Sequence, residues 1–475
     1  MKSPLIASIA LVLVMLPFAS CNDDDESTGS GSALMTDAGP DQTITQPAPV
    51  LLDGSNSMSN LRITSYEWTR AYGPDTFRIE NAKAVRTEVY NLASGVHGFA
   101  LTVRDAAGRV ASDTVQVTVN PGGEPLCNNI DRPVVNARLV PIGTLSEARA
   151  GMTAVAAGSK ILFAGANWSG AGVNGYGSSR VDIFDTATGQ WSTARLSEAR
   201  SAIGAVAAGN KVFFAGGRLH GGGNGAPDVI FSTVDIYDAA TGAWSVASLS
   251  QPRAFVAAAA LGEKVFFAGG ERGGDHFPSD RVDIYELSTG QWSTASLSEP
   301  RGLAAAVAVG GKVYFAGGFK EDIWNPSFSD RIDVYDGTTG SWSTASLRYP
   351  MGYVAGLAVG DDIFWLGGCT MERRNVKTGQ ISLGQLFKPA FPEFMLNNAV
   401  VKDNKLLLFR SGGEDVHRFD IFDLGTGTWS IGVLPQDGIV NKSIIALGNE
   451  VYLAGGATLG GSSPTPVNQV WRLEF

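Results

Sequence analysis

Short apolar runs and polar turn sequences alternate along most of the chain, in a unit that returns about every 50 residues. The unit is written in closely similar form at 190–217, 243–270, 291–318 and 341–368. Each copy holds a run of small apolar residues and then a bulky run such as KVFFAGG, and a VDIYD-like segment follows after a variable loop. Runs of this length between turn residues predict β-strands, four to each unit.

Side-chain size changes in a regular way across these four strands. The first strand carries Ala, Gly and Val, as in 202–208 and 303–309, whereas the fourth begins with tryptophan. Strands that converge on a central axis have room only for small side chains, while outer strands can carry large ones. The gradient therefore predicts the blades of a β-propeller. The tryptophans are Trp191, Trp244, Trp292, Trp342 and Trp429.

Glycine pairs after the second strand point to a particular kind of repeat. Gly165-Ala166 is a degenerate copy of the pair, and a Tyr or Phe in the third strand and the tryptophan follow in phase. This series resembles kelch repeats, which implies a seven-bladed kelch-type β-propeller over 134–475. The intact pairs are Gly216-Gly217, Gly269-Gly270, Gly317-Gly318, Gly367-Gly368, Gly412-Gly413 and Gly455-Gly456.

The last blade of this propeller lacks a fourth strand at its end of the chain. The chain ends at Phe475 after the third-strand-like segment 468–475, whereas 137–145 resembles a fourth strand without a blade of its own. We predict that 137–145 completes the last blade and closes the ring, because closure removes the open edges that promote aggregation.

Residues 34–120 alternate apolar and polar positions over short segments that are separated by Gly, Ser, Asn and Pro. About five to seven short strands in one segment of this size predict an Ig-like β-sandwich. The phrases AGPDQTI, LDGSNS, SYEWT and LTVRDAAG resemble the PKD family of Ig-like modules. The resemblance implies a spacer with Trp68 in its core, and it leaves open a Ca²⁺ site near Asp53 or Asp105. The fold class is therefore all-β, with this sandwich, a linker at 121–133 and then the propeller.

The first 20 residues have the features of an export signal. Lys2 precedes an apolar run, Leu5 to Phe18, that is short for a membrane span. The run ends in Phe18-Ala19-Ser20-Cys21, which resembles a bacterial lipobox and implies cleavage before Cys21 and lipidation of its thiol. The alternative is an ordinary secretory signal with an incidental cysteine.

An acidic and then Gly/Ser-rich tether follows at 21–33. Its segment NDDDE resembles the tag that sends lipoproteins to the cell surface in Bacteroidetes-type bacteria. We therefore expect an exported outer-membrane lipoprotein that is exposed at the cell surface and held in the outer membrane by lipid on Cys21. A merely solvated tether, and the inner or outer leaflet, stay open as alternatives.

Charge and cysteine content add two expectations. The net charge of −10 excludes nucleic acid as the expected partner, because phosphate binding requires clustered Lys and Arg. Apart from Cys21, the cysteines are Cys127 and Cys369. An exported protein could pair them. Their place in different modules argues against a disulfide, and whether they pair stays open.

A candidate binding surface follows from strand direction. The loops after the glycine pairs and the fourth-to-first-strand connections lie at one face of the propeller, which we call the loop face. Each connection carries an arginine, and four arginines at a channel mouth suit carboxylates or acidic sugars. The alternative is that each arginine bonds loop carbonyls as part of the scaffold. The candidate ligand-binding residues are Arg149, Arg200, Arg253, Arg301, Trp168, Tyr176, His220, His276 and Trp324.

The VDI-type segments carry a second recurrent pair of charges. Arg180 and Asp182, Arg281 and Asp283, and Arg331 and Asp333 each flank one residue of a third strand. We predict that these residues form ion pairs between blades and have no part in ligand binding.

Three functions compete at this point, and we favour a binding protein for a glycan or a protein ligand. The alternative is a kelch-fold enzyme that acts on sugars, similar to a sialate mutarotase or to galactose oxidase. Galactose oxidase needs two His and two Tyr at copper, whereas His220, His276 and His417 belong to separate repeats. We therefore assign no catalytic residue, no metal site and no cofactor. The third alternative is a purely structural envelope protein.

Overall fold

The structure is a computed structural model of the chain. It describes residues 34–45, 49–74, 77–90, 92, 95–120, 132–165, 177–221, 228–273, 277–321, 327–386, 398–409, 416–435, 439–458 and 465–475. The export signal, Cys21, the tether and most of the linker lie outside these residues. Within them, no helix has the length and hydropathy of a membrane span.

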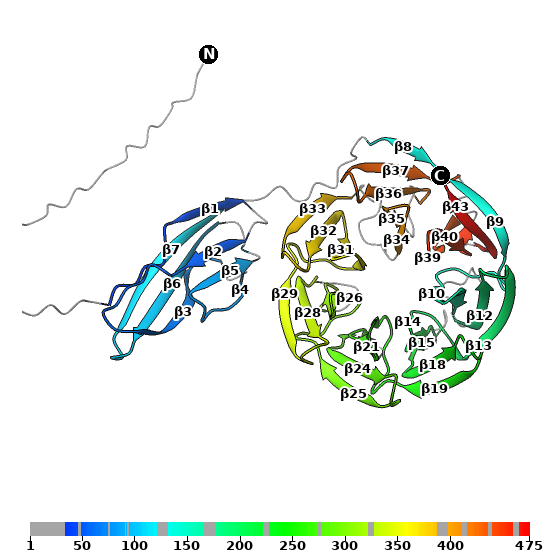
Figure 1. Cartoon of the computed structure of the whole chain (residues 1–475), viewed down its shortest axis with the longest axis horizontal. Helices are drawn as coiled ribbons and strands as arrows, with labels where there is room; N and C mark the ends of the chain where they lie inside the picture. The colour runs from blue at the N-terminus through cyan, green and yellow to red at the C-terminus, as the bar shows by residue number, and fades with distance from the viewer. Residues whose placement is uncertain are drawn as a thin grey trace, which may run out of the picture.

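The N-terminal module is a β-sandwich (Figure 1). Its alternating segments bury one side of each strand, and Trp68, Phe99, Leu101 and Val117 lie in the core between the sheets. Trp68 is 1% exposed and donates from its indole nitrogen to the carbonyl of Ala84. One sheet contains β1 (Gln42–Thr45), β7 (Val110–Asn120), β6 (Gly95–Asp105) and β3 (Ile63–Tyr72). The other contains β2 (Val50–Asp53), β5 (Arg86–Tyr90) and β4 (Arg78–Ile79).

The second module is a ring of seven β-sheets, and each contains four strands that follow one another from the centre outward (Figure 1). Blade one has β10 (Thr153–Ala157), β11 (Lys160–Ala164), β12 (Ser178–Asp185) and β13 (Gln190–Arg200). Blade two has β14 (Gly204–Ala208), β15 (Lys211–Ala215), β18 (Thr233–Asp238) and β19 (Trp244–Ser248). Blade three has β20 (Ala257–Leu261), β21 (Lys264–Ala268), β24 (Arg281–Glu286) and β25 (Trp292–Ser296).

The remaining blades follow the same order. Blade four has β26 (Ala305–Val309), β27 (Lys312–Ala316), β28 (Arg331–Asp336) and β29 (Trp342–Ser346). Blade five has β30 (Ala355–Val359), β31 (Asp362–Gly367), β32 (Thr370–Asn375) and β33 (Ile381–Gln385). Blade six has β34 (Asn398–Lys402), β35 (Lys405–Phe409), β36 (Arg418–Asp423) and β37 (Trp429–Val433). Blade seven has β39 (Ser443–Leu447), β40 (Glu450–Ala454), β43 (Gln469–Glu474) and β9 (Arg138–Thr144).

The ring closes through a strand from the beginning of the module. β9 pairs antiparallel with β43, so the fourth strand of blade seven precedes blade one in the chain. The inner strand β39 of blade seven contacts the inner strand β10 of blade one. A further strand, β8 (Val134–Asn136), pairs parallel with β37 at the outer edge of blade six.

The hydrophobic cores lie between adjacent blades. One core joins Leu162 and Phe214, and the next joins Phe213 and Phe267, so each bulky second strand packs against both neighbouring blades. The fourth-strand tryptophans are only half-buried. Trp244, for example, packs against Tyr237 with 5.0 Å between the ring centroids.

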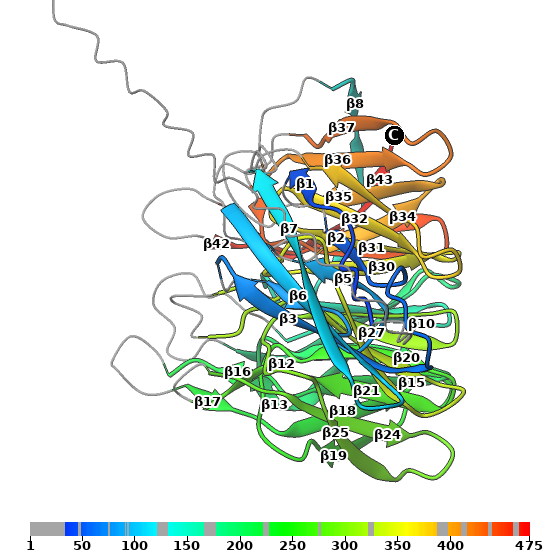
Figure 2. The same cartoon turned by 90° about the vertical axis from the view of Figure 1, so that its left-hand side faces the viewer.

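The loop face carries short hairpins that extend from the blades. Figure 2 shows β16 (Arg218–Leu219), β17 (Val229–Ile230) and β42 (Thr465–Pro466) at the same side of the ring. The other short strands are β22 (Glu271–Arg272), β23 (Phe277–Pro278), β38 (Ile439–Val440) and β41 (Ala457–Thr458). They hold the non-repeating residues that the site is built from.

The cysteine expectation was wrong for Cys369. This residue is 6% exposed at the turn between β31 and β32, and it is disulfide-bonded. Both other cysteines of the chain lie outside the described residues.

The two modules contact each other at the edge of blade four. The guanidinium of Arg348 lies 5.7 Å from the centroid of the Tyr90 ring, and Nε of Arg78 lies 3.9 Å from a carboxylate oxygen of Asp330. The sandwich therefore touches the propeller through charged and aromatic side chains of β4 and β5.

Candidate functional site

The four predicted arginines lie inside the propeller and not at its surface. Arg200, Arg253 and Arg301 are 0% exposed, and Arg149 is 2% exposed. Each is ion-paired with the aspartate of a VDI-type third strand, and Arg200 reaches Asp235 at 2.6 Å. A guanidinium without solvent access cannot meet a ligand, so the prediction of an arginine-lined channel mouth was wrong. The scaffold alternative is the one that the contacts support.

Each arginine links two consecutive blades. In blade two, the N–H of Gly217 donates to the carbonyl of Arg253 at 2.9 Å. The Arg253 guanidinium then donates forward to blade three, to the carboxylate of Asp283 and to the carbonyl of Arg281 at 2.8 Å. Burial lowers the pKa of Arg253, and the Asp283 carboxylate opposes that shift. The pair therefore has its charges compensated within the scaffold.

The aspartates have different partners from the predicted ones. Asp182 and Asp283 bind Arg149 and Arg253 of the connections, and not the Arg180 and Arg281 that flank them in sequence. The second oxygen of Asp283 accepts from the backbone N–H of Ser250 in the preceding connection at 2.9 Å. The ion pairs between blades therefore exist, but with the connection arginines.

Blades five and six keep the buried acid and obtain a cation elsewhere. In blade five Met351 replaces the arginine, and Arg374 lies 3.0 Å from the buried Glu372. In blade six Arg132, which precedes β8, lies 2.6 Å from Asp420 and 4.5 Å from the Trp429 ring centroid. A buried carboxylate at this position is thus always neutralised among the described residues.

Of the other predicted site residues, the structure describes His220 only. Trp168, Tyr176, His276 and Trp324 lie in the loops 166–176, 274–276 and 322–326, outside the described residues. His220 lies in the β16–β17 hairpin and is half-buried.

A ring of left-handed residues lies where the connections enter the inner strands. In the six blades where the structure describes it, the residue two places after the arginine position has positive φ, although most of these residues are not glycine. Such backbone costs about 1–2 kcal/mol per residue and clusters at ligand sites. The Phe255 N–H donates to the Ala202 carbonyl at 2.9 Å, so these residues are joined from blade to blade. They are Gly151, Ala202, Phe255, Leu303, Tyr353 and Asn441.

A charged cluster lies on the loop face between blades two and three. We define it as Arg218, His220, Asp228 and Glu271. Nδ1 of His220 lies 2.9 Å from Oδ2 of Asp228, and NH1 of Arg218 lies 3.3 Å from Oε2 of Glu271 and 3.9 Å from Asp228. The Arg218 guanidinium also covers the Phe255 ring at 4.8 Å from its centroid. The cluster thus reaches the ring of left-handed residues.

Sequence reasoning named His220 but missed Arg218, Asp228, Glu271 and Phe255. A signal for them was available, because repeats can be compared with one another. Arg218 and Glu271 directly follow the glycine pairs of blades two and three, where blades four and seven have Phe319 and Ala457. Where equivalent positions of different blades carry different residues, the fold does not require one particular residue at that position.

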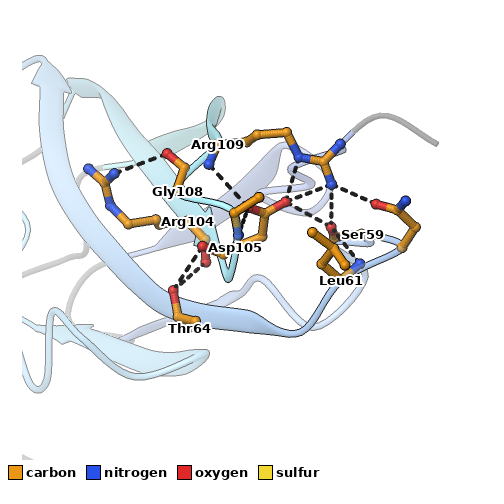
Figure 3. Close-up of polar contacts among 9 residues, drawn as sticks. Ser59, Leu61, Thr64, Arg104, Asp105, Gly108 and Arg109 are labelled. Atoms are coloured by element: carbon orange, nitrogen blue, oxygen red, sulfur yellow. Dashed lines mark hydrogen bonds and ion pairs between the residues drawn. The ribbon is translucent and has the colours of Figure 1, made fainter. Parts of the chain in front are cut away.

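The open Ca²⁺ site of the N-terminal module finds no support at Asp105. Its carboxylate accepts hydrogen bonds from Arg109 and Ser59 and from the N–H of Ala107 (Figure 3). Burial raises the pKa of Asp105, but these hydrogen bonds outweigh it and the pKa is lowered. At Asp53, the Arg86 hydrogen bond lowers the pKa to about 2. Both carboxylates therefore serve ion pairs.

No group of three or more His, Cys, Asp or Glu side chains among the described residues could hold a metal ion. The charged cluster holds one histidine and two carboxylates, and its arginine takes the position beside both acids. The described site therefore offers hydrogen-bond donors and acceptors beside aromatic and apolar side chains.

Comparison with known proteins assigns both modules. A PKD domain family model matches residues 38–119, and the Kelch motif model matches 252–296 and 300–346. The chain contains a PKD domain followed by kelch repeats. The matched Kelch segments cover most of blades three and four, and the other blades repeat their geometry.

Curated relatives match the PKD domain. The Dyslexia-associated protein KIAA0319-like protein of Mus musculus is 39% identical over 84 residues, which are 18% of this chain and 8% of that protein. The Low-density lipoprotein receptor-related protein 11 of Homo sapiens is 34% identical over 86 residues, or 18% of this chain and 17% of that protein. The chain thus spans less than a fifth of the length of these relatives.

Two solved structures are similar to parts of the chain. "Structure of YjhT" has 15% identity and a TM-score of 0.41, and the match covers 68% of this chain and 95% of that one. "Solution structure of the PKD domain from KIAA 1837 protein" has 37% identity and a TM-score of 0.19, over 21% of this chain and 97% of that one.

Proposed function

We propose that this chain is an exported, lipid-anchored protein of the cell envelope that binds a glycan or protein ligand on the loop face of its kelch propeller. The supporting observation is where the repeat breaks down. Most buried positions recur from blade to blade, whereas the position after a glycine pair and the left-handed positions carry Arg218, Phe255 and Tyr353. Strained backbone that displays different side chains on one face favours recognition over scaffolding.

Apolar side chains on the same face add contact surface. Phe277 in β23 is 50% exposed and Val229 in β17 is 49% exposed. Exposed apolar residues are normal when scattered, but Val229 directly follows Asp228, and Phe277 pairs with Arg272, the residue after Glu271. A ligand on this face would therefore meet apolar contacts beside a polar centre.

The ligand is tested with a thermal-shift screen of the detergent-solubilised full chain against neutral glycans, acidic glycans, peptides and divalent metals. A ligand that binds only the folded state at about 100 times its Kd stabilises by about 2.7 kcal/mol. We expect a saturable rise in the propeller midpoint that Phe277→Ala reduces. The matched control is Val246→Ala, because Val246 is 61% exposed in the outer strand β19, away from the loop face.

Three outcomes would speak against this proposal. Silence across the whole panel would favour a structural role, and chemical turnover of a bound sugar would favour the enzyme alternative. A metal-specific shift would likewise revive metal-dependent catalysis.

The anchor is tested by replacing the predicted lipidated residue. We expect Cys21→Ser to abolish metabolic labelling with a radioactive fatty acid and to move the chain from the membrane fraction to the soluble fraction. The physical reason is that the covalent lipid supplies the affinity of this chain for the membrane. Cys369→Ser serves as the control, because it should leave labelling unchanged. Labelling that persists in Cys21→Ser would contradict the proposal.

A further inference from the structure

We propose that the charged cluster of Arg218, His220, Asp228 and Glu271 is the specificity centre of the loop face, and that it selects a neutral, polyhydroxylated ligand, a carbohydrate, over acidic glycans and peptides. This inference rests on the proposed binding function. It assigns the site to blades two and three, where the cluster lies beside the inner strands.

The fold does not require these charges. The position after the glycine pair is buried in several blades: Glu271 is 0% exposed, Phe319 1% and Ala457 1%. Phe319 and Ala457 show that this position accepts apolar residues, as a core position of this scaffold should. A buried ion pair is seldom more stabilising than apolar residues of similar volume. Folding alone therefore does not explain why Arg218 and Glu271 stand at these positions, and a functional role does.

The cluster holds its groups in fixed positions from the interior to the surface. The exposed fraction of the side chain rises from 1% at Glu271 to 12% at Arg218, 16% at Asp228 and 29% at His220. Each member contacts the next, and the Phe255 ring packs against the guanidinium. Because Glu271 has almost no solvent access, it positions Arg218, and the more exposed Arg218, Asp228 and His220 are the members that can contact a ligand. Side chains locked by their neighbours lose little entropy when a ligand binds.

The charges of the cluster select against an acidic ligand. Two carboxylates and one guanidinium leave a net negative charge when the imidazole is neutral, so an added carboxylate would be repelled. Donors and acceptors lie side by side, with NH1 of Arg218 within 3.3 Å of Glu271 and 3.9 Å of Asp228. A hydroxyl both donates and accepts, so vicinal hydroxyls of a neutral sugar match this arrangement.

The surroundings favour a sugar over a protein partner. The centre of a protein interface is depleted of charged residues, whereas here the charges lie at the centre and single apolar side chains flank them. Phe277, which is 50% exposed, offers aromatic surface that suits the apolar face of a sugar ring. Phe277 comes from blade three, and the charged members Arg218, His220 and Asp228 come from blade two.

The test uses a variant that removes the charges and keeps the volume. Arg218→Met/Glu271→Leu replaces the pair with apolar residues. Leucine is preferred to phenylalanine at this position because the Phe319 ring lies where a Cβ on Gly302 would be, and blade three has Ala254 in place of that glycine. The control is Lys312→Met/Asp336→Asn, which removes a 2.7 Å ion pair at the opposite face of the propeller.

Binding of neutral oligosaccharides, acidic oligosaccharides and peptides to the detergent-solubilised full chain is measured by titration calorimetry. We expect the wild type and the control to prefer neutral oligosaccharides. We expect Arg218→Met/Glu271→Leu to bind them at least about tenfold more weakly, with an unchanged thermal midpoint. The single variant Arg218→Ala should in addition lower the midpoint, because it leaves Glu271 buried without the Arg218 guanidinium.

The outcomes separate this inference from the function it rests on. Unchanged affinity in the double variant, or a preference for acidic glycans or peptides in the wild type, would overturn the inference and leave a binding protein. Failure of the wild type to bind any member of the three classes would overturn the proposed function itself.

Discussion

Replacing Arg253 with alanine should lower the free energy of unfolding of the propeller by about 3–5 kcal/mol. The variant leaves the Asp283 carboxylate, which is 2% exposed, in the interior without its guanidinium. It also removes the hydrogen bonds to the carbonyls of Arg281 and Phe267. Because an unpaired buried charge costs more than the pair contributes, the loss comes from the aspartate that remains.

Urea unfolding of the full chain measures this effect. Arg253→Ala/Asp283→Ala should cost less than Arg253→Ala alone, since no charge is left unpaired. Arg281→Ala is the matched control: its side chain flanks Asp283 in sequence but does not bind it. If the Arg253→Ala variant kept its stability and lost only ligand binding, the sequence-based prediction of ligand-binding arginines would be supported. An Arg281→Ala as costly as Arg253→Ala would place the ion pair where the sequence first suggested it.

The propeller could be predicted from local features of the sequence. The small residues of 202–208 and the KVFFAGG run specify an inner and a second strand in each copy, because strand period and side-chain size act over a few residues. The pairing in the last blade could also be predicted, because 137–145 has the pattern of a fourth strand and 468–475 is a third strand that no fourth strand follows. β9 and β43 form that pair.

The direction of a side chain could not be predicted in the same way. Arg200 lies at the end of β13, and nothing in the local sequence says that it turns inward to Asp235. Its recurrence was nevertheless informative, because a residue repeated in phase with the glycine pairs is part of the repeated contacts. The prediction that these arginines line the channel mouth did not take enough account of their recurrence.

Contacts between segments that are distant in the chain could not be predicted from the sequence, for a different reason. Arg132 neutralises Asp420 across 288 positions of the chain, and no period connects them. The charged cluster of Arg218, His220, Asp228 and Glu271 combines residues from two blades, so it exists only after the blades have packed. Loop sites on other repeat proteins have the same origin. The repeated sequence predicts the fold, but the packing of the blades decides which loop residues lie next to one another.

Replacing Gly270 with alanine should destabilise the propeller by about 2–5 kcal/mol, the sum of left-handed strain and steric overlap. Gly270 has a φ of +97°, and a Cβ there would lie 2.5 Å from the backbone carbonyl oxygen of Ala254. That oxygen accepts a hydrogen bond from the N–H of Glu271 and cannot move without breaking it. The N–H of Gly270 itself donates to the Arg301 carbonyl at 2.9 Å, so a shift would also disturb the connection to blade four.

Gly242→Ala separates strain from overlap, because Gly242 has a φ of +75° with no atom within 4 Å of its added Cβ. This control should cost about 1 kcal/mol, from backbone strain alone. Urea unfolding of the full chain compares the two variants. Equal costs would mean that the glycine pair serves only backbone conformation. A larger cost at Gly270 would mean that the glycine is required for the close approach of the loop to Ala254, in the connection that enters the same blade. That approach also places Glu271, the residue directly after Gly270, beneath Arg218, so the glycine pair that joins the blades would also set the position of the proposed ligand site.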